Sequence, residues 1–155
     1  MSRNSCQFSI ESTLAVTPSR LWEHSTNPDG INREFRPLLT MTFPEATLAI
    51  TENWQPGKRL FRSWMLLGGF LPVEYDDIAL VEVDPGRRFL ERSEMFSQSI
   101  WEHERTIEPV DGGALLRDRL HFRPRIAVLG PAYGWIFKLV FRVRHRNLRR
   151  LFGSL

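Results

Sequence analysis

The chain has 155 residues, 42% of them hydrophobic and 25% charged, with a formal net charge of +3. This composition predicts a single globular domain over residues 1–155 and excludes a disordered or low-complexity chain. One cysteine, Cys6, excludes an intrachain disulfide, and no apolar run approaches the ~20 residues of a membrane span. Because no charged-then-apolar leader opens the sequence, we expect a cytoplasmic protein.

The N-terminal part predicts one strand followed by two short helices. Residues 6–16 alternate between polar and apolar side chains, as in a half-buried strand. The apolar side holds Phe8, Ile10, Leu14 and Val16. The dipeptides Thr17-Pro18 and Asn27-Pro28 each combine an N-cap residue with proline at the first helical position. Short helices are therefore expected after each of them, ending near Ser25 and Phe35.

The middle of the chain alternates strand patterns with turn signals. It predicts an antiparallel meander, because tight turns join only antiparallel neighbours. Extended segments are expected over 40–43, 47–54, 59–67, 73–83 and 87–96. In segment 73–83, one phase is expected to face the interior, and it contains Val73, Tyr75, Ala79, Val81 and Val83. Asp77 has the same phase, so we favour a bulge at Asp76-Asp77 that turns it outward. The sequence of segment 87–96 does not show which of its alternating side chains face the interior.

Residues 98–125 contain the clearest pattern, two long strands joined by a tight turn within Asp111-Gly112-Gly113. If Asp111-Gly112 is the loop, the numbers of facing residues sum to 223. If Gly112-Gly113 is the loop, they sum to 225. Both sums are odd, so odd positions of the first strand share a face with even positions of the second in either register.

This parity divides the hairpin into two faces. The water-facing side pairs opposite charges, with Glu102, Glu104, Thr106 and Glu108 against Arg117, Arg119, His121 and Arg123. The interior side is large and mostly apolar, with Trp101, His103, Arg105 and Ile107 against Leu116, Asp118, Leu120 and Phe122. In the first register Arg105 directly faces Asp118, and buried charges are costly unless they are paired. The two form either a structural ion pair, which we favour, or the polar end of a pocket.

A long amphipathic helix is predicted after Gly130-Pro131, because no helix breaker occurs between Gly134 and Gly153. Its apolar positions recur at helical spacing and include Ile136, Phe137, Val140, Phe141, Val143, Leu148 and Phe152. The helix must bury this stripe, and the predicted sheet is the only large surface available.

Basic residues are concentrated at the C-terminal end. Residues 117–155 hold ten Lys or Arg and one acidic residue, a charge of +9, whereas residues 1–116 hold eleven basic and seventeen acidic residues, a charge of −6. An anionic membrane could bind the basic side chains of the predicted helix weakly, namely Arg142, Arg146, Arg149 and Arg150. A solvated helix face is the favoured interpretation. Nucleic-acid binding is not expected, because the aromatic residues of this helix lie mainly on its apolar side.

This order of elements resembles the START-like, helix-grip arrangement of the SRPBCC superfamily. The runs W-x-H-x-R at 101–105, L-x-D-x-L-x-F at 116–122 and F-x-x-R at 141–144 resemble its polyketide cyclase/dehydrase-like or coenzyme-Q-binding-like members. The resemblance covers nearly the whole chain. It implies an α+β fold in which a curved antiparallel sheet of about six or seven strands wraps around the long C-terminal helix. It also implies a cavity between sheet and helix that holds a lipid, isoprenoid or polyketide-like molecule.

The groups expected to line this cavity are Tyr75, Trp101, His103, Arg105, Asp118, Leu120, Phe122, Ile136, Phe137 and Val140. The superfamily has no common catalytic set, so no catalytic residue is carried over from it. Because the bulky apolar face is interrupted by only a few polar side chains, we expect a non-catalytic protein that binds or transports a small hydrophobic molecule. The alternative is a polyketide cyclase or dehydratase in which His103 is the base and Arg105 stabilises the enolate. No metal is expected, because the four histidines lie in different elements, and no dinucleotide or phosphate motif indicates a cofactor.

Overall fold

The computed structural model of this protein describes residues 4–155, so Met1, Ser2 and Arg3 of the predicted domain lie outside the described residues. The described elements, in chain order, are β1 Cys6–Leu14, α1 Pro18–Thr26, α2 Pro28–Phe35, β2 Leu39–Met41, β3 Arg59–Leu67, β4 Leu71–Asp84, β5 Arg88–Met95, β6 Gln98–Val110, β7 Gly113–Pro124, the 3-10 helix η1 Ala127–Leu129 and α3 Gly130–Phe152.

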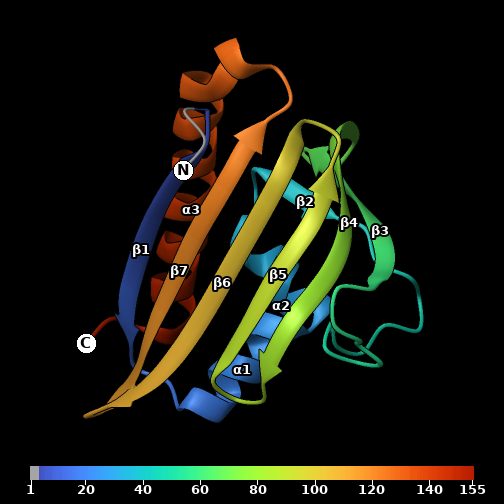
Figure 1. Cartoon of the computed structure of the whole chain (residues 1–155). Helices are drawn as coiled ribbons and strands as arrows, with labels where there is room; N and C mark the ends of the chain where they lie inside the picture. Colours follow the sequence, from blue (N-terminus) through green and yellow to red (C-terminus); the bar gives the residue numbers. More distant parts are fainter. Residues whose placement is uncertain (1–3) are drawn as a thin grey trace.

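The seven described strands form one sheet in the order β1-β7-β6-β5-β4-β3-β2. Each neighbouring pair is antiparallel. The sheet is curved, and Figure 1 shows its outer, convex face with the three α-helices behind it, α3 lying behind β1 and β7. The predicted α+β helix-grip fold is therefore confirmed, with α3 held on the concave face of the sheet.

Both short helices begin at the predicted caps. The Thr17 hydroxyl accepts a hydrogen bond from the Arg20 N–H at 3.4 Å, and the Asn27 side chain accepts one from the Gly30 N–H at 2.7 Å. Each cap is followed by proline within the first turn. The first helix ends at Thr26, one residue beyond its predicted end, and the second ends where it was predicted.

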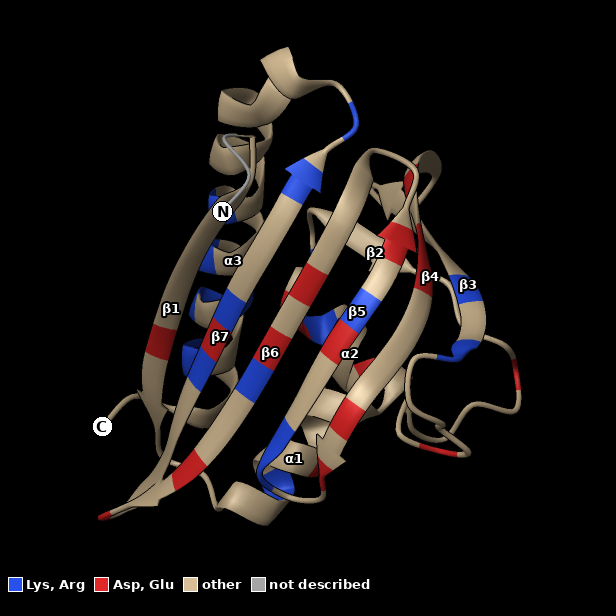
Figure 2. Ribbon diagram, in the orientation of Figure 1, with Lys and Arg blue, Asp and Glu red and all other residues tan. Residues whose placement is uncertain are grey.

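The hairpin of β6 and β7 has the register in which facing numbers sum to 223. Arg105 therefore faces Asp118 directly, and Asp111-Gly112 forms the turn. Gly112 has a φ of 84°, the left-handed conformation that such a turn requires. The predicted interior side of the hairpin is buried throughout. On the convex side, acidic residues of β6 lie between basic residues of β7 and β5, as in the pairs of Glu104 with Arg119 and Arg88. Figure 2 marks the charged residues along these strands.

The interior face of β4 differs from the prediction. The buried phase contains Asp76, Ile78 and Leu80, whereas the Tyr75 ring lies on the convex face, 3.9 Å from the Arg62 guanidinium. The register shift in the pairing of β4 with β5 lies just after Leu80 and not at Asp76-Asp77. A bulge reverses which side chains of a strand face inward. The prediction assumed uninterrupted alternation along the whole strand, so it assigned Tyr75 to the wrong face.

Asp77 faces outward, as expected, although the expected bulge beside it is absent. Its carboxylate accepts hydrogen bonds from the Arg62 guanidinium at 2.7 and 3.0 Å. Asp76 and Asp77 therefore lie on opposite faces of the sheet through simple alternation. This alternation places the carboxyl group of Asp76 inside the protein.

The predicted strand over 47–54 is a loop with local turns. The N–H groups of Thr47 and Glu52 each donate to a carbonyl three residues earlier, at 3.0 and 3.1 Å. Ile50 is buried, and its N–H donates to the Thr26 carbonyl at the end of α1. These local bonds occupy backbone groups that strand pairing would need, so the apolar alternation of the segment does not produce a strand.

The long C-terminal helix is confirmed as α3, and its basic residues Lys138, Arg142, Arg146, Arg149 and Arg150 are exposed (Figure 2). The apolar stripe packs on the sheet, but Ile136 stays 41% exposed. Arg144 and His145 are buried with the stripe, which the apolar spacing did not predict. Of the helices in the described part of the chain, none has the length and apolar character needed to cross a bilayer.

The interior consists of two apolar clusters with a polar layer between them. The larger cluster contains Trp101 and Phe137, and the smaller one contains Leu116 and Leu148. Between them the inner positions of four elements are polar, namely Ser12 on β1, Arg105 on β6, Asp118 on β7 and His145 on α3. Buried polar side chains need partners inside the protein, so this layer constrains how the elements meet.

Gly30 is expected to be essential for the contact between α1 and α2. A Cβ atom at this position would lie 1.9 Å from the His24 carbonyl oxygen, so Gly30→Ala should lower the free energy of unfolding by about 1–3 kcal/mol. Gly134→Ala is the matched control, because a Cβ there meets nothing within 4 Å, and it should raise stability by about 0.5–1 kcal/mol. Urea unfolding checks both values, and equal stabilisation by the two substitutions would contradict this account.

Candidate functional site

A buried ion cluster occupies the polar layer, and we define it as Glu34, Arg105, Asp118 and Arg144. These residues come from α2, β6, β7 and α3, so the cluster joins two helices to two adjacent strands of the sheet. Each of them is at most 6% exposed. Charges at this depth are tolerated only when they are paired and hydrogen-bonded.

Arg105 lies at the centre of the ion cluster and has no exposed surface. Its guanidinium has five N–H groups in a fixed planar fork. Nε and Nη2 donate to the two oxygens of Asp118 at 2.7 and 2.8 Å, and Nη2 and Nη1 donate to those of Glu34 at 2.8 and 3.0 Å. The remaining Nη1 hydrogen is donated to the Ser25 hydroxyl at 3.2 Å. Every donor of Arg105 has an acceptor in the protein, and none is left for a ligand.

The two carboxylate oxygens of Asp118 are likewise fully hydrogen-bonded inside the protein. Its Oδ1 accepts from Arg105 Nε and His103 Nε2, both at 2.7 Å, and its Oδ2 accepts from Arg105 Nη2 and His145 Nε2, both at 2.8 Å. Burial by itself raises the pKa of Asp118, but Arg105 and His103 outweigh burial and hold the pKa well below its usual range. Because an ionised carboxylate only accepts hydrogen bonds, both imidazoles carry a hydrogen on Nε2.

His145 extends the hydrogen-bonded network from Asp118 to β1. Its Nδ1 lies 2.8 Å from the hydroxyl of Ser12, which accepts a hydrogen bond from Arg149 Nη1 at 2.9 Å. The hydroxyl hydrogen of Ser12 is therefore free to be donated to His145 Nδ1. The sequence pattern assigned His145 to no site, whereas the structure shows that it connects α3 to both β7 and β1.

Glu34 connects α2 to both arginines. Its Oε1 accepts from Arg144 at 3.2 Å for Nε and 3.1 Å for Nη2, in addition to its bonds with Arg105. Burial raises the pKa of Glu34, but the charges of Arg105 and Arg144 more than offset this, so the pKa lies below its ordinary value of 4.5. The Arg144 guanidinium also lies 4.5 Å from the Phe35 ring and 4.8 Å from the Phe141 ring. Two arginines and two carboxylates leave the ion cluster without net charge.

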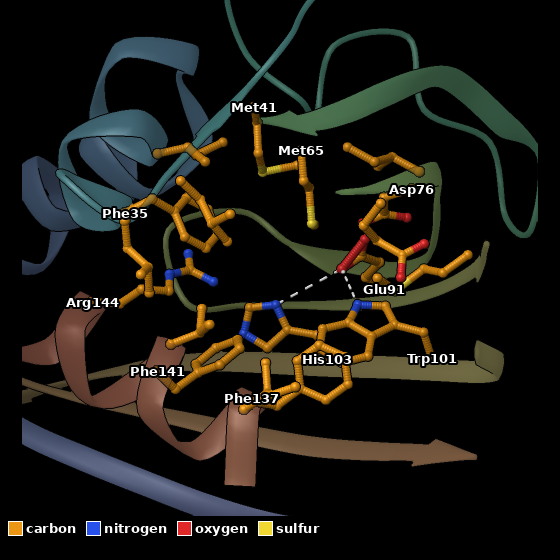
Figure 3. A pocket seen from close by; sticks show the side chains of 18 of the residues that line it. Phe35, Met41, Met65, Asp76, Glu91, Trp101, His103, Phe137, Phe141 and Arg144 are labelled. Carbon is orange, nitrogen blue, oxygen red and sulfur yellow. Dashed lines mark hydrogen bonds and ion pairs between the residues drawn. The ribbon is translucent and has the colours of Figure 1, made fainter. Parts of the chain in front are cut away.

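A cavity of about 350 Å³ lies beside the ion cluster, between the sheet and α3. Most of the side chains that line it are apolar, and its polar end includes His103 and Arg144 (Figure 3). Some lining residues remain exposed, namely Leu67, Val73, Ile136 and Leu139. The cavity therefore reaches the surface between the β3–β4 hairpin and the N-terminal half of α3.

The structure divides the ten predicted cavity residues into two groups. Five line the cavity, namely Trp101, His103, Ile136, Phe137 and Val140. Leu120 and Phe122 are buried in the larger apolar cluster behind the cavity surface, and Arg105 and Asp118 are enclosed in the ion cluster. Tyr75 lies on the convex face, so its predicted place in the cavity is wrong.

Three carboxyl groups line the sheet side of the cavity, and we call Glu74, Asp76 and Glu91 the acid wall. Glu91 Oε1 accepts a hydrogen bond from Trp101 Nε1 at 3.2 Å and lies 3.8 Å from His103 Nδ1 (Figure 3). The sequence analysis missed these groups, because it placed the Asp76 side chain on the other face of β4 and left the phase of segment 87–96 open. The available signal for the acid wall was an acidic residue that shares one face of a strand with apolar neighbours.

Neither the ion cluster nor the acid wall is arranged as a metal site. Among residues 4–155, no three His, Cys, Asp or Glu side chains converge in a way that could hold a metal ion. The carboxylates of the ion cluster are occupied by arginine and histidine donors. What the site offers chemically is an apolar cavity with a neutral polar end and an acidic side wall.

Comparison with known proteins adds a family and a fold. A family model described as "Domain of unknown function (DUF8410)" matches residues 12–152. No curated protein matches the sequence significantly.

Solved structures share the architecture at low sequence identity. Protein CV1439 from Chromobacterium violaceum superposes with a TM-score of 0.74 at 14% identity, covering 96% of this chain and 98% of its own. A START superfamily protein from Mycobacterium smegmatis gives 0.63 at 8% identity, covering 95% and 98%. DynU16, from the dynemicin biosynthetic locus, gives 0.60 at 14% identity, covering 97% of this chain and 49% of its own. This likeness concerns the fold alone, and it confirms the START-like helix-grip fold.

Replacing Asp118 with Asn is expected to lower the free energy of unfolding at pH 7 by about 3–5 kcal/mol, because Arg105 loses a buried counter-charge. The pKa of Asp118 is lower in the folded than in the unfolded chain. Its contribution is therefore complete above the ordinary pKa of 3.8 and is lost as the pH falls below that value. Urea unfolding should give the same difference between variant and wild type at pH 7 and pH 5, and a smaller one at pH 3.

The control for Asp118→Asn is Glu11→Gln, which removes one partner of the exposed pair between Glu11 and Arg117. Exposed ion pairs contribute little, so this change should cost less than about 1 kcal/mol at every pH. A cost for Asp118→Asn as small as that of the control would show that the ion cluster does not hold the fold together.

Proposed function

The chain belongs to the DUF8410 family, whose description states no activity, and from the geometry of its site we propose that it binds a small hydrophobic molecule in the cavity between the sheet and α3. The observation that carries this proposal is the cavity itself. Protein interiors are normally packed with few voids larger than a water molecule. A space of about 350 Å³ lined mostly by apolar side chains therefore supports the binding of a ligand.

Aromatic side chains support the proposal by giving the cavity a firm wall. Trp101 and Phe137 line it with ring centroids 4.8 Å apart, and Phe141 lies 6.5 Å from the same tryptophan. Packed rings of this kind hold their shape without a ligand, so little ordering is needed when a ligand binds. Lipids, isoprenoids and polyketide-like molecules are the ligand classes that we propose for this protein.

A ligand of this kind should stabilise the protein by mass action. At a hundredfold excess over its dissociation constant it adds about 2.7 kcal/mol, which corresponds to a rise in melting temperature of about 5–10 °C for a domain of this size. Native mass spectrometry of protein purified from cells, together with thermal shifts against fatty acids, isoprenoids and aromatic polyketides, tests the proposal. No retained molecule and no shift with any compound would count against it.

Val140→Phe is expected to weaken binding of the best ligand from that panel at least tenfold, because Val140 is buried on α3 and its side chain lines the cavity. Val143→Phe is the matched control, since Val143 lies one turn away on the same helix and does not line the cavity. It should change the dissociation constant less than twofold. Isothermal titration calorimetry gives both values, and equal effects of the two substitutions would place the ligand elsewhere.

A second candidate function is a polyketide cyclase or dehydratase-type enzyme. It rests on His103, which lines the cavity and is oriented by its hydrogen bond to Asp118. An imidazole held by a buried carboxylate is an arrangement used by general bases. The role predicted for Arg105 at an enolate is wrong for this geometry, because all its donors are occupied inside the ion cluster. Arg144 is the cationic side chain that lines the cavity.

If the protein is an enzyme, His103→Ala should reduce turnover of a polyketide-like substrate about a hundredfold or more while leaving substrate binding nearly unchanged. His121→Ala is the control, because His121 lies on the convex face opposite Glu102. Product formation followed by mass spectrometry, with dissociation constants from calorimetry, separates the two effects. Unchanged turnover in the His103 variant would end the enzymatic alternative.

A further inference from the structure

The acid wall carries more formal negative charge than an apolar cavity tolerates without partners. Glu74 and Asp76 project from β4 and Glu91 from β5, so three carboxyl groups share one side of the cavity. The basic side chain in the lining is Arg144, and its charge is already matched by Glu34 at 3.1 Å. The unbalanced field inside the cavity is therefore negative.

Two of the three carboxyls are held by the protein. Glu91 accepts hydrogen bonds from the Ser93 hydroxyl at 2.9 Å and from Trp101 Nε1 at 3.2 Å. Glu74 accepts from the N–H groups of Tyr75 and Ser97, both at 3.1 Å, and from the Ser97 hydroxyl. Each of these carboxylates has donors for both oxygens and has no need of a ligand.

Asp76 is different, because it lines the cavity, is 2% exposed and has one oxygen, Oδ1, without a partner among the described residues. Burial, followed by the hydrogen-bonded neighbour Glu91, raises the pKa of Asp76 well above its usual range. Burial and the neighbouring Glu91 carboxyl therefore both oppose ionisation of Asp76, and a cation beside Asp76 would favour it. The Oδ1 atom of Asp76 lacks a hydrogen-bond donor among the described residues, and a buried acceptor left unsatisfied is costly.

We propose that the cavity selects hydrophobic molecules whose polar group donates hydrogen bonds, namely long-chain amines and alcohols, and that this group lies at Asp76. An ammonium group supplies both a donor and the missing positive charge, and a hydroxyl group supplies the donor. A carboxylate or phosphate group places a second anion against the acid wall, and an ether supplies no donor. This inference rests on the proposed function, and it names the chemical class of the ligand.

Acidic ligands at Arg144 are the competing outcome. The bonds of Arg144 to Glu34 use Nε and Nη2, and arginine is a common partner of carboxylates. The balanced charge of the ion cluster removes most of the attraction, because Glu34 lies against the same guanidinium. The acid wall has no such balance, so the donor-bearing class is favoured.

The test compares four probes with the same ten-carbon chain: decylamine, 1-decanol, decyl methyl ether and decanoate. The two ionic probes are used below their critical micelle concentrations and the two neutral probes below their solubility limits. Calorimetry with the wild type should give dissociation constants at least tenfold lower for decylamine and 1-decanol than for the other two. Asp76→Leu removes the carboxyl at similar size and should abolish this preference. Asp77→Leu is the matched control, because the neighbouring carboxyl faces outward to Arg62, and it should keep the preference.

Asp76→Asn keeps an acceptor and a donor toward Glu91 but cannot ionise. It should retain 1-decanol binding within about threefold and weaken decylamine binding at least tenfold, because residue 76 can then no longer ionise beside the ammonium group. If Asp76→Leu does not fold, the inference is tested by Asp76→Asn and by the order in which the wild type binds the four probes. Equal binding of all four probes, tighter binding of decanoate, or an unchanged preference in Asp76→Leu would overturn the inference and leave the proposed function standing. Absence of binding by every probe would instead overturn the proposed function.

Discussion

The guanidinium of Arg105 is buried without any contact with water, and its five N–H groups must all find acceptors inside the protein. They find them on three different elements: Asp118 on β7, Glu34 on α2 and Ser25 on α1. A planar donor fork accepts only a narrow range of geometries, so these elements are held at fixed positions relative to β6. Arg144 and His145 then extend the same network to α3. The ion cluster therefore sets how the helices sit on the sheet.

The polar layer also separates two ends of the interior, of which one lines the cavity and the other does not. On one side of it the smaller apolar cluster, around Leu116 and Leu148, contributes no side chain to the lining of the cavity. On the other side the sheet curves away from α3, and the aromatic side chains of Trp101 and Phe137 line a space instead of filling it. The ion cluster joins α3 to α2 and to β7 at the inner end of this space.

The cavity thus has two polar boundaries of opposite character. The ion cluster at its inner end is balanced, with two arginines matched to two carboxylates, and every donor of Arg105 is used within the protein. The acid wall along β4 and β5 is unbalanced, and Asp76 has an oxygen without a partner among the described residues. A group that is fully satisfied stabilises the fold, whereas an unsatisfied one in a cavity favours a ligand. The proposed recognition of a ligand therefore depends on Asp76 and not on Arg105.

The sequence by itself determined which residues of the last hairpin share a face, because side-chain alternation and a two-residue turn leave no other parity. It also determined the helix starts at Thr17 and Asn27 and the long final helix, since caps and periodicity are local properties. Only the tertiary structure decided the inner face of β4, where a bulge after Leu80 reverses the alternation. Likewise, only the tertiary structure brought Asp76 beside Glu91 and Glu34 beside Arg105, because such contacts depend on strand register and helix placement, which no local pattern encodes.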